Sequence, residues 1–183
     1  MQILEAALKI VDHKGIQALT LREIADNVGV SEAALFRHFK NKEDIVDSLT
    51  SMVLNGNQFF PKGEGPWEAL EHMLVWKLEL LHRNPPHTSV LFQEDIFREF
   101  PSVKERFDLR RSSRTLFIRQ LVREGQQQGV FAADVDDEAF SLLFMGSLRL
   151  VVLEWRQAGF SYDLRAKSAP LLHLLRKILE VRN

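Results

Sequence analysis

The chain has 183 residues, of which 45% are apolar and 27% charged, a mixture typical of globular proteins that excludes extensive intrinsic disorder. It contains no cysteine, which excludes disulfide bonds, thiolate zinc sites and a cysteine nucleophile. No uncharged apolar run reaches the ~18–20 residues of a membrane-spanning helix, and no signal peptide is visible, so we expect a cytoplasmic protein without a membrane partner. The 24 basic and 25 acidic residues leave a net charge of −1, so any site for nucleic acid must be a local arrangement.

Apolar residues recur at helical spacing through almost the whole chain, whereas the period-two alternation of a β-strand is missing. The sequence therefore predicts an all-α fold of about nine helices. The first four are expected at about residues 3–13, 20–28, 31–38 and 42–53. Thr20 and Ser31 are good N-caps for the second and third of these helices, and Glu23 follows Thr20 in capping-box register.

Residues 56–66 contain three glycines and two prolines, and they are the most plausible link between an N-terminal module and a larger C-terminal one. We accordingly predict two domains, a helix-turn-helix domain over residues 1–48 and a helical domain over residues 49–183. In the C-terminal module, helices are expected at about residues 66–82, in a short stretch up to 100, and at 101–129, 137–158 and 164–181.

Residues 20–39 have the pattern of two short helices that meet at Gly29. Glycine readily adopts the positive φ that a tight turn between helices requires. Ala25 is small where the helices must approach, and Ile24 and Leu35 are among the apolar residues of their shared core. This pattern is typical of a helix-turn-helix, whose second helix enters the DNA major groove by its N-terminal end. A purely structural helical hairpin is the alternative interpretation.

The run from Gly29 to Lys42, GVSEAALFRHFKNK, brings the turn, the second helix, the His38-Phe39 step and the opening of the next helix into one register. In this region the sequence resembles the TetR family of transcriptional regulators. The resemblance implies a three-helix DNA-binding domain, a connecting fourth helix and a variable C-terminal helical domain for ligand binding and dimerisation. It also implies a homodimeric repressor that a small hydrophobic ligand releases from a palindromic operator of double-stranded DNA.

Carried over to this sequence, the family pattern places base contacts at the start of the third helix and phosphate contacts around it. Glu32 can accept from a cytosine amino group, Ala33 or Ala34 can pack on a thymine methyl, and Arg22 can bind guanine. Phosphate contacts are implied for Thr20, His38 and Lys42. The expected DNA-binding residues are Thr20, Arg22, Ser31, Glu32, Ala33, Ala34, Phe36, Arg37, His38 and Lys42.

Each of these assignments has a structural alternative. Glu32 can be a helix N-terminal acid favoured by the dipole, Arg22 a solvated surface residue, and His38 a packed residue at a helix end. The sequence also departs from the family pattern, because Phe36 stands where the family usually has tyrosine. Residues 1–50 contain six basic and eight acidic residues, a balance of −2 that is poor for a DNA-binding domain.

Eleven of the thirteen phenylalanines and all three tryptophans lie beyond residue 58, where they can line an apolar cavity for a small molecule or form an ordinary core. The expected ligand-pocket residues are Met73, Trp76, Phe92, Phe97, Arg114, Phe117 and Phe144. Arg114 lies on one helical stripe with Phe107, Arg111, Ile118 and Leu121. It therefore needs a partner or an exit to water, and it can pair with Glu94 or Asp95 or bind an anionic ligand bidentately.

Residues 137–158 are apolar nearly all round, so we expect this helix to be buried on both sides, with a second copy of the chain covering one of them. A central core helix in a monomer is the alternative. The expected dimer-interface residues on this helix and the last one are Leu148, Val152, Leu171, Leu175 and Ile178.

An enzyme is the main rival class, because His72, His82 and His87 accompany Glu94 and Asp95. Their spacing fits no metal signature, and no nucleophile elbow, phosphate loop or dinucleotide fingerprint occurs. We therefore expect neither an enzyme nor a cofactor or metal. The more serious rival is a helical protein-interaction module that keeps the hairpin without binding specific DNA.

Overall fold

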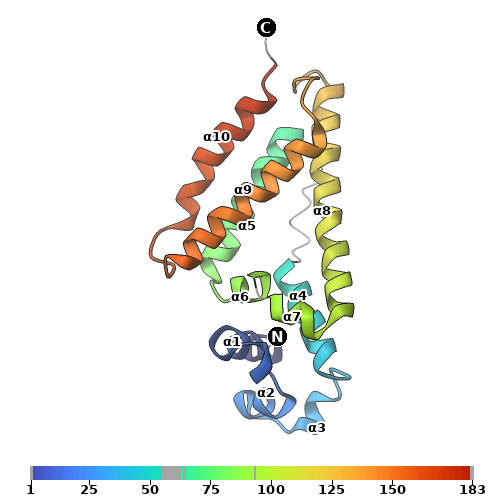
Figure 1. Cartoon of the computed structure of the whole chain (residues 1–183), viewed down its shortest axis with the longest axis vertical. Coiled ribbons are helices and arrows are strands. Elements are labelled where there is room, and N and C mark those ends of the chain that lie inside the picture. The colour runs from blue at the N-terminus through green and yellow to red at the C-terminus, as the bar shows by residue number, and fades with distance from the viewer. Residues whose placement is uncertain (1, 55–62, 64, 93, 182–183) are drawn as a thin grey trace. The chain divides into compact units, whose positions relative to one another are not determined.

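The computed structural model describes residues 2–54, 63, 65–92 and 94–181, which form ten α-helices and no β-strand (Figure 1). The expectation of an all-α fold is confirmed. The helices are α1 (Gln2–Lys14), α2 (Leu21–Val28), α3 (Glu32–Leu35), α4 (Lys42–Leu54), α5 (Pro66–Arg83), α6 (His87–Phe92), α7 (Glu94–Glu99), α8 (Pro101–Gln127), α9 (Asp137–Gln157) and α10 (Ser168–Leu179). Short 3-10 turns precede α2 and α10 at Ile16–Ala18 and Leu164–Lys167.

Side-chain caps fix the beginnings of the two hairpin helices. The Thr20 hydroxyl accepts a hydrogen bond from the Glu23 amide at 3.0 Å, and the Ser31 hydroxyl accepts one from the Ala34 amide at 3.2 Å. These bonds satisfy amide groups that a helix N-terminus leaves without a partner in the helix. Only the Thr20 half of the capping box is formed, because the Glu23 carboxylate accepts a hydrogen bond from Lys14 Nζ at 2.6 Å instead.

One predicted helix is shorter in the structure. Helix α3 ends at Leu35, since the His38 amide bonds to the Leu35 carbonyl at 2.9 Å and tightens the chain into a turn. The short helix expected up to residue 100 corresponds to α6 and α7, which lie on either side of residue 93, and that residue is outside the described residues.

The chain packs as two compact units. The first comprises residues 1–56 and 86–110, and the second comprises residues 57–85 and 111–183. Helices α6 and α7 and the first ten residues of α8 therefore belong with the N-terminal helices. Helix α8 is continuous through the boundary between Arg110 and Arg111. The boundary proposed from the sequence between residues 48 and 49 stays a prediction.

Each unit has its own apolar core. In the first unit, α1, α2, α3 and α4 contribute Ala7, Val11, Ile24, Leu35, Ile45 and Leu49, and the later segments add Val90, Ile96 and Val103. In the second unit, the most deeply buried side chains include Leu70, Met73, Leu74, Leu78, Phe144 and Trp155. The Trp155 indole donates to the Tyr162 carbonyl at 2.7 Å, so this large core residue is also satisfied as a donor.

Within the described ranges, no helix combines the length and apolar character that a membrane crossing needs.

Candidate functional site

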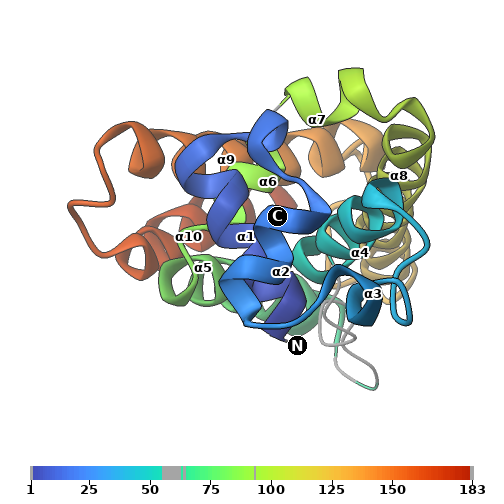
Figure 2. The same cartoon turned by 90° about the horizontal axis from the view of Figure 1, so that it is seen from below.

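The hairpin of α2 and α3 presents the start of α3 at the surface of the first unit. Figure 2 shows the two helices joined by the turn at Gly29, whose φ of +77° places it in the left-handed region. Leu35, the last residue of α3, is fully buried, whereas Glu32 and Ala33 are exposed and Ala34 is half-buried. The buried leucine therefore anchors the helix while its first residues face solvent.

The residues expected to contact phosphate surround this exposed end. Thr20, Arg22, Arg37 and His38 are exposed, and Arg22 lies 4.0 Å from Asp26 of its own helix in a weak surface pair. The Thr20 hydroxyl is already an acceptor in the cap of α2, and its hydrogen remains available to a phosphate oxygen. These side chains are accessible to a ligand at the surface of the hairpin.

Lys42 is the first residue of α4, and its side chain contacts residues at and directly after the end of α7. Its ammonium group lies 2.8 Å from Glu99 Oε1 and 5.5 Å from the centroid of the Phe100 ring. Gln17 also donates to the Glu99 carboxylate, at 2.9 Å. A phosphate group at Lys42 must therefore compete with Glu99.

Apolar surface accompanies the polar residues of α3. Phe36 is 53% exposed directly after the helix. Ala34, His38 and Phe39 line a groove of about 520 Å³ together with Leu4 and other residues of the first unit. The ring at position 36 is therefore more than half exposed and is not part of the buried core.

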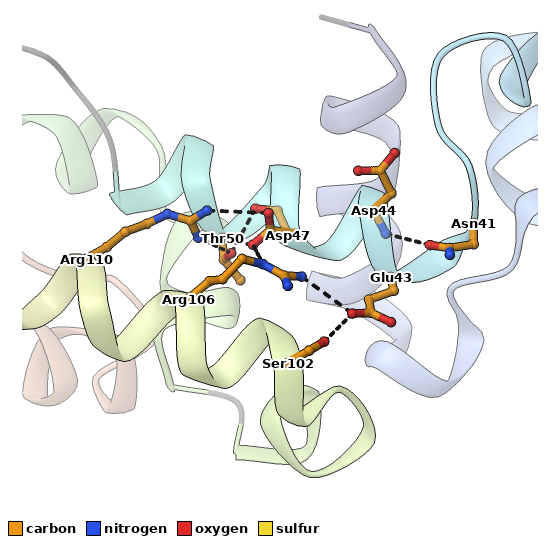
Figure 3. A network of polar contacts seen from close by, with 8 residues as sticks. All are labelled: Asn41, Glu43, Asp44, Asp47, Thr50, Ser102, Arg106 and Arg110. Atoms are coloured by element: carbon orange, nitrogen blue, oxygen red, sulfur yellow. Dashed lines mark hydrogen bonds and ion pairs between the residues drawn. The ribbon is translucent and has the colours of Figure 1, made fainter.

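Two acidic side chains of the N-terminal region are neutralised by arginines of α8 (Figure 3). Arg110 donates to both carboxylate oxygens of Asp47 at 3.1 and 3.4 Å. Arg106 Nε lies 3.0 Å from Asp47, and its Nη2 lies 3.4 Å from Glu43. Partial burial raises the pKa of the Asp47 carboxyl, but hydrogen bonds from Arg110 and Arg106 outweigh this effect and hold the pKa below its ordinary value. The unfavourable charge count of residues 1–50 therefore overstates the negative charge available to repel DNA.

The residues expected to form a ligand pocket fall into both units. Phe92 and Phe97 belong to the first unit, where the Phe97 ring packs 4.6 Å from that of Phe107. The other five lie in the second unit, where Met73, Arg114 and Phe144 are buried and Trp76 and Phe117 are half-buried.

Lys77 is a second buried cation that the sequence reasoning missed. Its side chain is 7% exposed and that of Arg114 is 5% exposed. Burial, together with the charge of Arg114, lowers the pKa of Lys77 to about 7. Its position between Leu74 and Leu78 on the apolar stripe of α5 was the available signal.

The expected dimer residues are mostly buried within the single chain. Leu148, Val152 and Leu175 pack inside the second unit, Leu171 is half-buried and Ile178 is partly exposed. Other apolar side chains of the same two helices remain at the surface, and they are Leu142, Leu143 and Leu150 on α9 and Leu174 on α10. The unit thus covers one side of α9 and leaves the opposite side exposed.

The histidines of the enzyme alternative belong to different units. His87 lies in the first unit, whereas His72 and His82 lie in the second, where His82 Nε2 is 3.7 Å from Asp163. Among the described residues, no cluster of three histidine, aspartate or glutamate side chains is arranged to hold a metal ion.

The capped hairpin with its exposed second helix, joined to a larger helical unit, defines the class of helix-turn-helix transcriptional regulators. Residues 3–49 match the family described as "Bacterial regulatory proteins, tetR family", and residues 72–178 match "YsiA-like protein, C-terminal region". The chain belongs to the TetR family of DNA-binding transcriptional regulators, and the resemblance seen in residues 29–42 is confirmed.

Among curated proteins, the chain is 25% identical over 167 residues to the HTH-type transcriptional repressor KstR2 of Mycobacterium tuberculosis, covering 86% of this chain and 81% of that protein. Among solved structures, it is similar to the fatty acid degradation regulator FadR from Bacillus halodurans, with a TM-score of 0.82, 22% identity and coverage of 99% and 96%. FadR from Bacillus subtilis in complex with stearoyl-CoA has a TM-score of 0.78, 22% identity and coverage of 98% and 99%.

Proposed function

We propose that this chain is a cytoplasmic, ligand-responsive repressor that binds a palindromic operator as a homodimer and leaves it when a small hydrophobic effector binds. The observation that carries the proposal is the exposed start of α3 on a capped hairpin, while Leu35 at the end of the same helix is buried. KstR2 of M. tuberculosis is a named repressor, and the B. subtilis FadR structure contains stearoyl-CoA. The first relative supports a repressor, and the second supports a regulator that responds to a lipid-like molecule.

In this proposal, the hairpin reads bases with its exposed side chains and holds phosphates with the residues around it. Glu32 and Ala33 face base edges in the major groove, with Arg22 at the neighbouring position. Arg37 and His38 contact the backbone, and Lys42 does so after it exchanges Glu99 for a phosphate.

The proposed effector has an apolar body and an anionic or strongly polar group. The apolar body packs among the aromatic side chains of the second unit, which include Phe117 and Phe144. Lys77 and Arg114 are two like charges in an apolar core, and the charge of Arg114 contributes to the lowered pKa of Lys77. An anionic group beside them relieves that repulsion and forms charge-assisted hydrogen bonds.

The proposed dimer uses the side of α9 and α10 that the single chain leaves uncovered. Leu142 and Leu150 are 73% and 55% exposed on α9, and Leu174 is 60% exposed on α10. Exposed apolar side chains on two adjacent helices suit a two-fold contact in which each copy covers the other. Two hairpins then reach half-sites about 34–36 Å apart.

Selection of bound sequences from a random DNA pool, followed by electrophoretic mobility shift, tests the DNA-binding half of the proposal. Lys42→Ala is expected to weaken selected and random DNA alike and to lower the salt slope of binding by about one. Lys9→Ala, which removes an exposed lysine of α1, is the matched control and should leave both unchanged. If no DNA is enriched at low salt, the helical interaction module becomes the better interpretation.

A further inference from the structure

Helices α4 and α8 face each other through matched polar side chains (Figure 3). Glu43, Asp47 and Thr50 are spaced by four and three residues on α4, so they share one face of that helix. Ser102, Arg106 and Arg110 are spaced by four residues on α8 and also share one face. All of these residues lie in the first unit.

The contacts between these faces are directional and partly shielded from water. The Arg110 guanidinium grips the Asp47 carboxylate through two nitrogens and also donates to Thr50 Oγ1 at 3.4 Å. Asp47 and Arg110 are only 23% and 25% exposed, and Thr50 is fully buried. Ser102 and Arg106 both contact the Glu43 carboxylate. A bidentate guanidinium–carboxylate contact of this kind fixes the relative orientation of the two helices more strictly than apolar packing does.

The same end of α4 is hydrogen-bonded to the turn that follows the recognition helix. Asn41 Oδ1 accepts from the Asp44 amide at 2.9 Å, and Asp44 Oδ2 accepts from the Lys40 amide at 3.1 Å. These two bonds close the turn that leads from α3 into α4. Because α3 has only four residues, its orientation depends on this turn and on the helix behind it.

Helix α8 extends from these arginines into the second unit. Residues 101–110 belong to the first unit and residues 111–127 to the second, without a break in the helix. Arg114 and Phe117, which the proposed function assigns to the effector, follow Arg110 by about 6 and 10 Å along the helix axis at the ordinary rise per residue. A rotation or shift of α8 at the effector therefore changes the geometry at Arg106 and Arg110.

We infer that Asp47 and Arg110, supported by Glu43 and Arg106, are positioning residues that couple effector binding to the orientation of the recognition helix. This inference rests on the proposed function and deepens it, because it names the contacts through which the regulator responds. In this inference, they act without contacting DNA bases or effector. Their replacement is expected to uncouple effector binding from operator binding while the chain still binds both ligands.

The test compares operator affinity with and without saturating stearoyl-CoA in the full chain. Asp47→Asn and Arg110→Met remove the paired contact from either side, and Arg110→Met keeps much of the apolar stem. Lys104→Met is the control, because Lys104 pairs with Asp108 of its own helix and not with α4. Allosteric couplings typically change affinity about 5- to 150-fold. The ratio of the two operator affinities is expected to fall below about 3-fold in both variants and to persist in the control.

Separate titrations of stearoyl-CoA and of operator DNA alone should give affinities within about 3-fold of the wild type for each variant, on the scale of a lost surface contact. Circular dichroism establishes that both variants are folded. An unchanged affinity ratio in both folded variants would overturn the inference.

Amide hydrogen exchange gives a second readout that needs no effector. Binding of operator DNA should slow exchange within residues 111–127 of the wild type and of Lys104→Met, and this protection should be lost in Arg110→Met. If stearoyl-CoA leaves wild-type operator affinity unchanged, the effector part of the proposed function fails, and the exchange experiment still decides the coupling. Equal protection in the wild type and Arg110→Met, or none in the wild type, contradicts the inference.

Discussion

Replacement of Lys77 by methionine should have opposite effects on stability and on effector binding. Methionine is close to lysine in length and has no charge, so Lys77→Met removes the buried ammonium while keeping an apolar stem in the core. Without effector, burial disfavours the charged form of Lys77, as its lowered pKa shows. With an anionic effector, the same charge becomes a binding partner.

The magnitude follows from the pKa of Lys77, which burial and the charge of Arg114 lower from 10.5 to about 7. A tenfold change in a proton equilibrium corresponds to about 1.4 kcal/mol, so the charged form costs the fold on the order of 5 kcal/mol. Between pH 7 and 10.5 the unfolded chain holds a proton that the folded chain lacks. The free energy of unfolding therefore rises with pH in this window by up to about 1.4 kcal/mol per pH unit. Below about pH 7 both states are protonated and the full penalty applies.

Urea unfolding of the wild type and Lys77→Met at several pH values between 6 and 10 measures this difference. The variant should be more stable by several kcal/mol at pH 6, and its advantage should shrink steadily as the pH rises. Lys177→Met, which removes an exposed lysine of α10, should show the wild-type dependence. Lys77→Met should also bind stearoyl-CoA more weakly. Equal pH slopes in the variant and wild type, or a less stable variant at pH 6, would refute the reasoning.

Three further substitutions test separate parts of the account. Gly125→Ala should lower the free energy of unfolding by about 1–3 kcal/mol in urea denaturation, because its new Cβ would overlap the Phe131 ring; an unchanged value would show that the ring moves aside freely. Leu142→Glu should convert the proposed dimer to a folded monomer in sedimentation equilibrium, and an unaltered dimer would place the interface elsewhere. Glu99→Gln should tighten binding to random DNA by up to about 5-fold, since Lys42 then has no competing carboxylate; anisotropy showing weaker binding would contradict this.

The limits of the helices were largely predictable because their signals are local. Thr20 and Ser31 act as N-caps through their own hydroxyl groups, and Pro66 and Pro101 stand at the first position of long helices. The length of α3 was harder to predict from the sequence, because a tight turn, closed by the hydrogen bond from the His38 amide to the Leu35 carbonyl, replaces its last predicted helical turn.

The composition of the first unit depends on contacts between distant parts of the sequence. Ser89 bonds to Asp12 across 77 residues, and Arg110 reaches Asp47 across 63. No local pattern indicates that residues 86–110 pack with the N-terminal helices. A charge count over residues 1–50 could not anticipate that Asp47 is neutralised from outside that range.

The second unit shows why a helical stripe identifies a core better than a site. Leu148 and Val152 were expected to face a second copy, but they pack inside the unit while Leu142 and Leu150 remain exposed. Periodicity shows that α9 has two apolar sides, and it does not say which side the rest of the chain covers. Lys77 was overlooked because lysine is rarely buried, although its neighbours mark a core stripe.

The most direct test of the central claim is a closed thermodynamic cycle of operator DNA and stearoyl-CoA on the wild-type chain. Fluorescence anisotropy gives the operator affinity with and without saturating stearoyl-CoA, and calorimetry gives the stearoyl-CoA affinity with and without saturating operator. The account predicts that each ligand weakens the other by the same factor, within the range of about 5- to 150-fold. Operator affinity that stays unchanged while stearoyl-CoA binds tightly would contradict it.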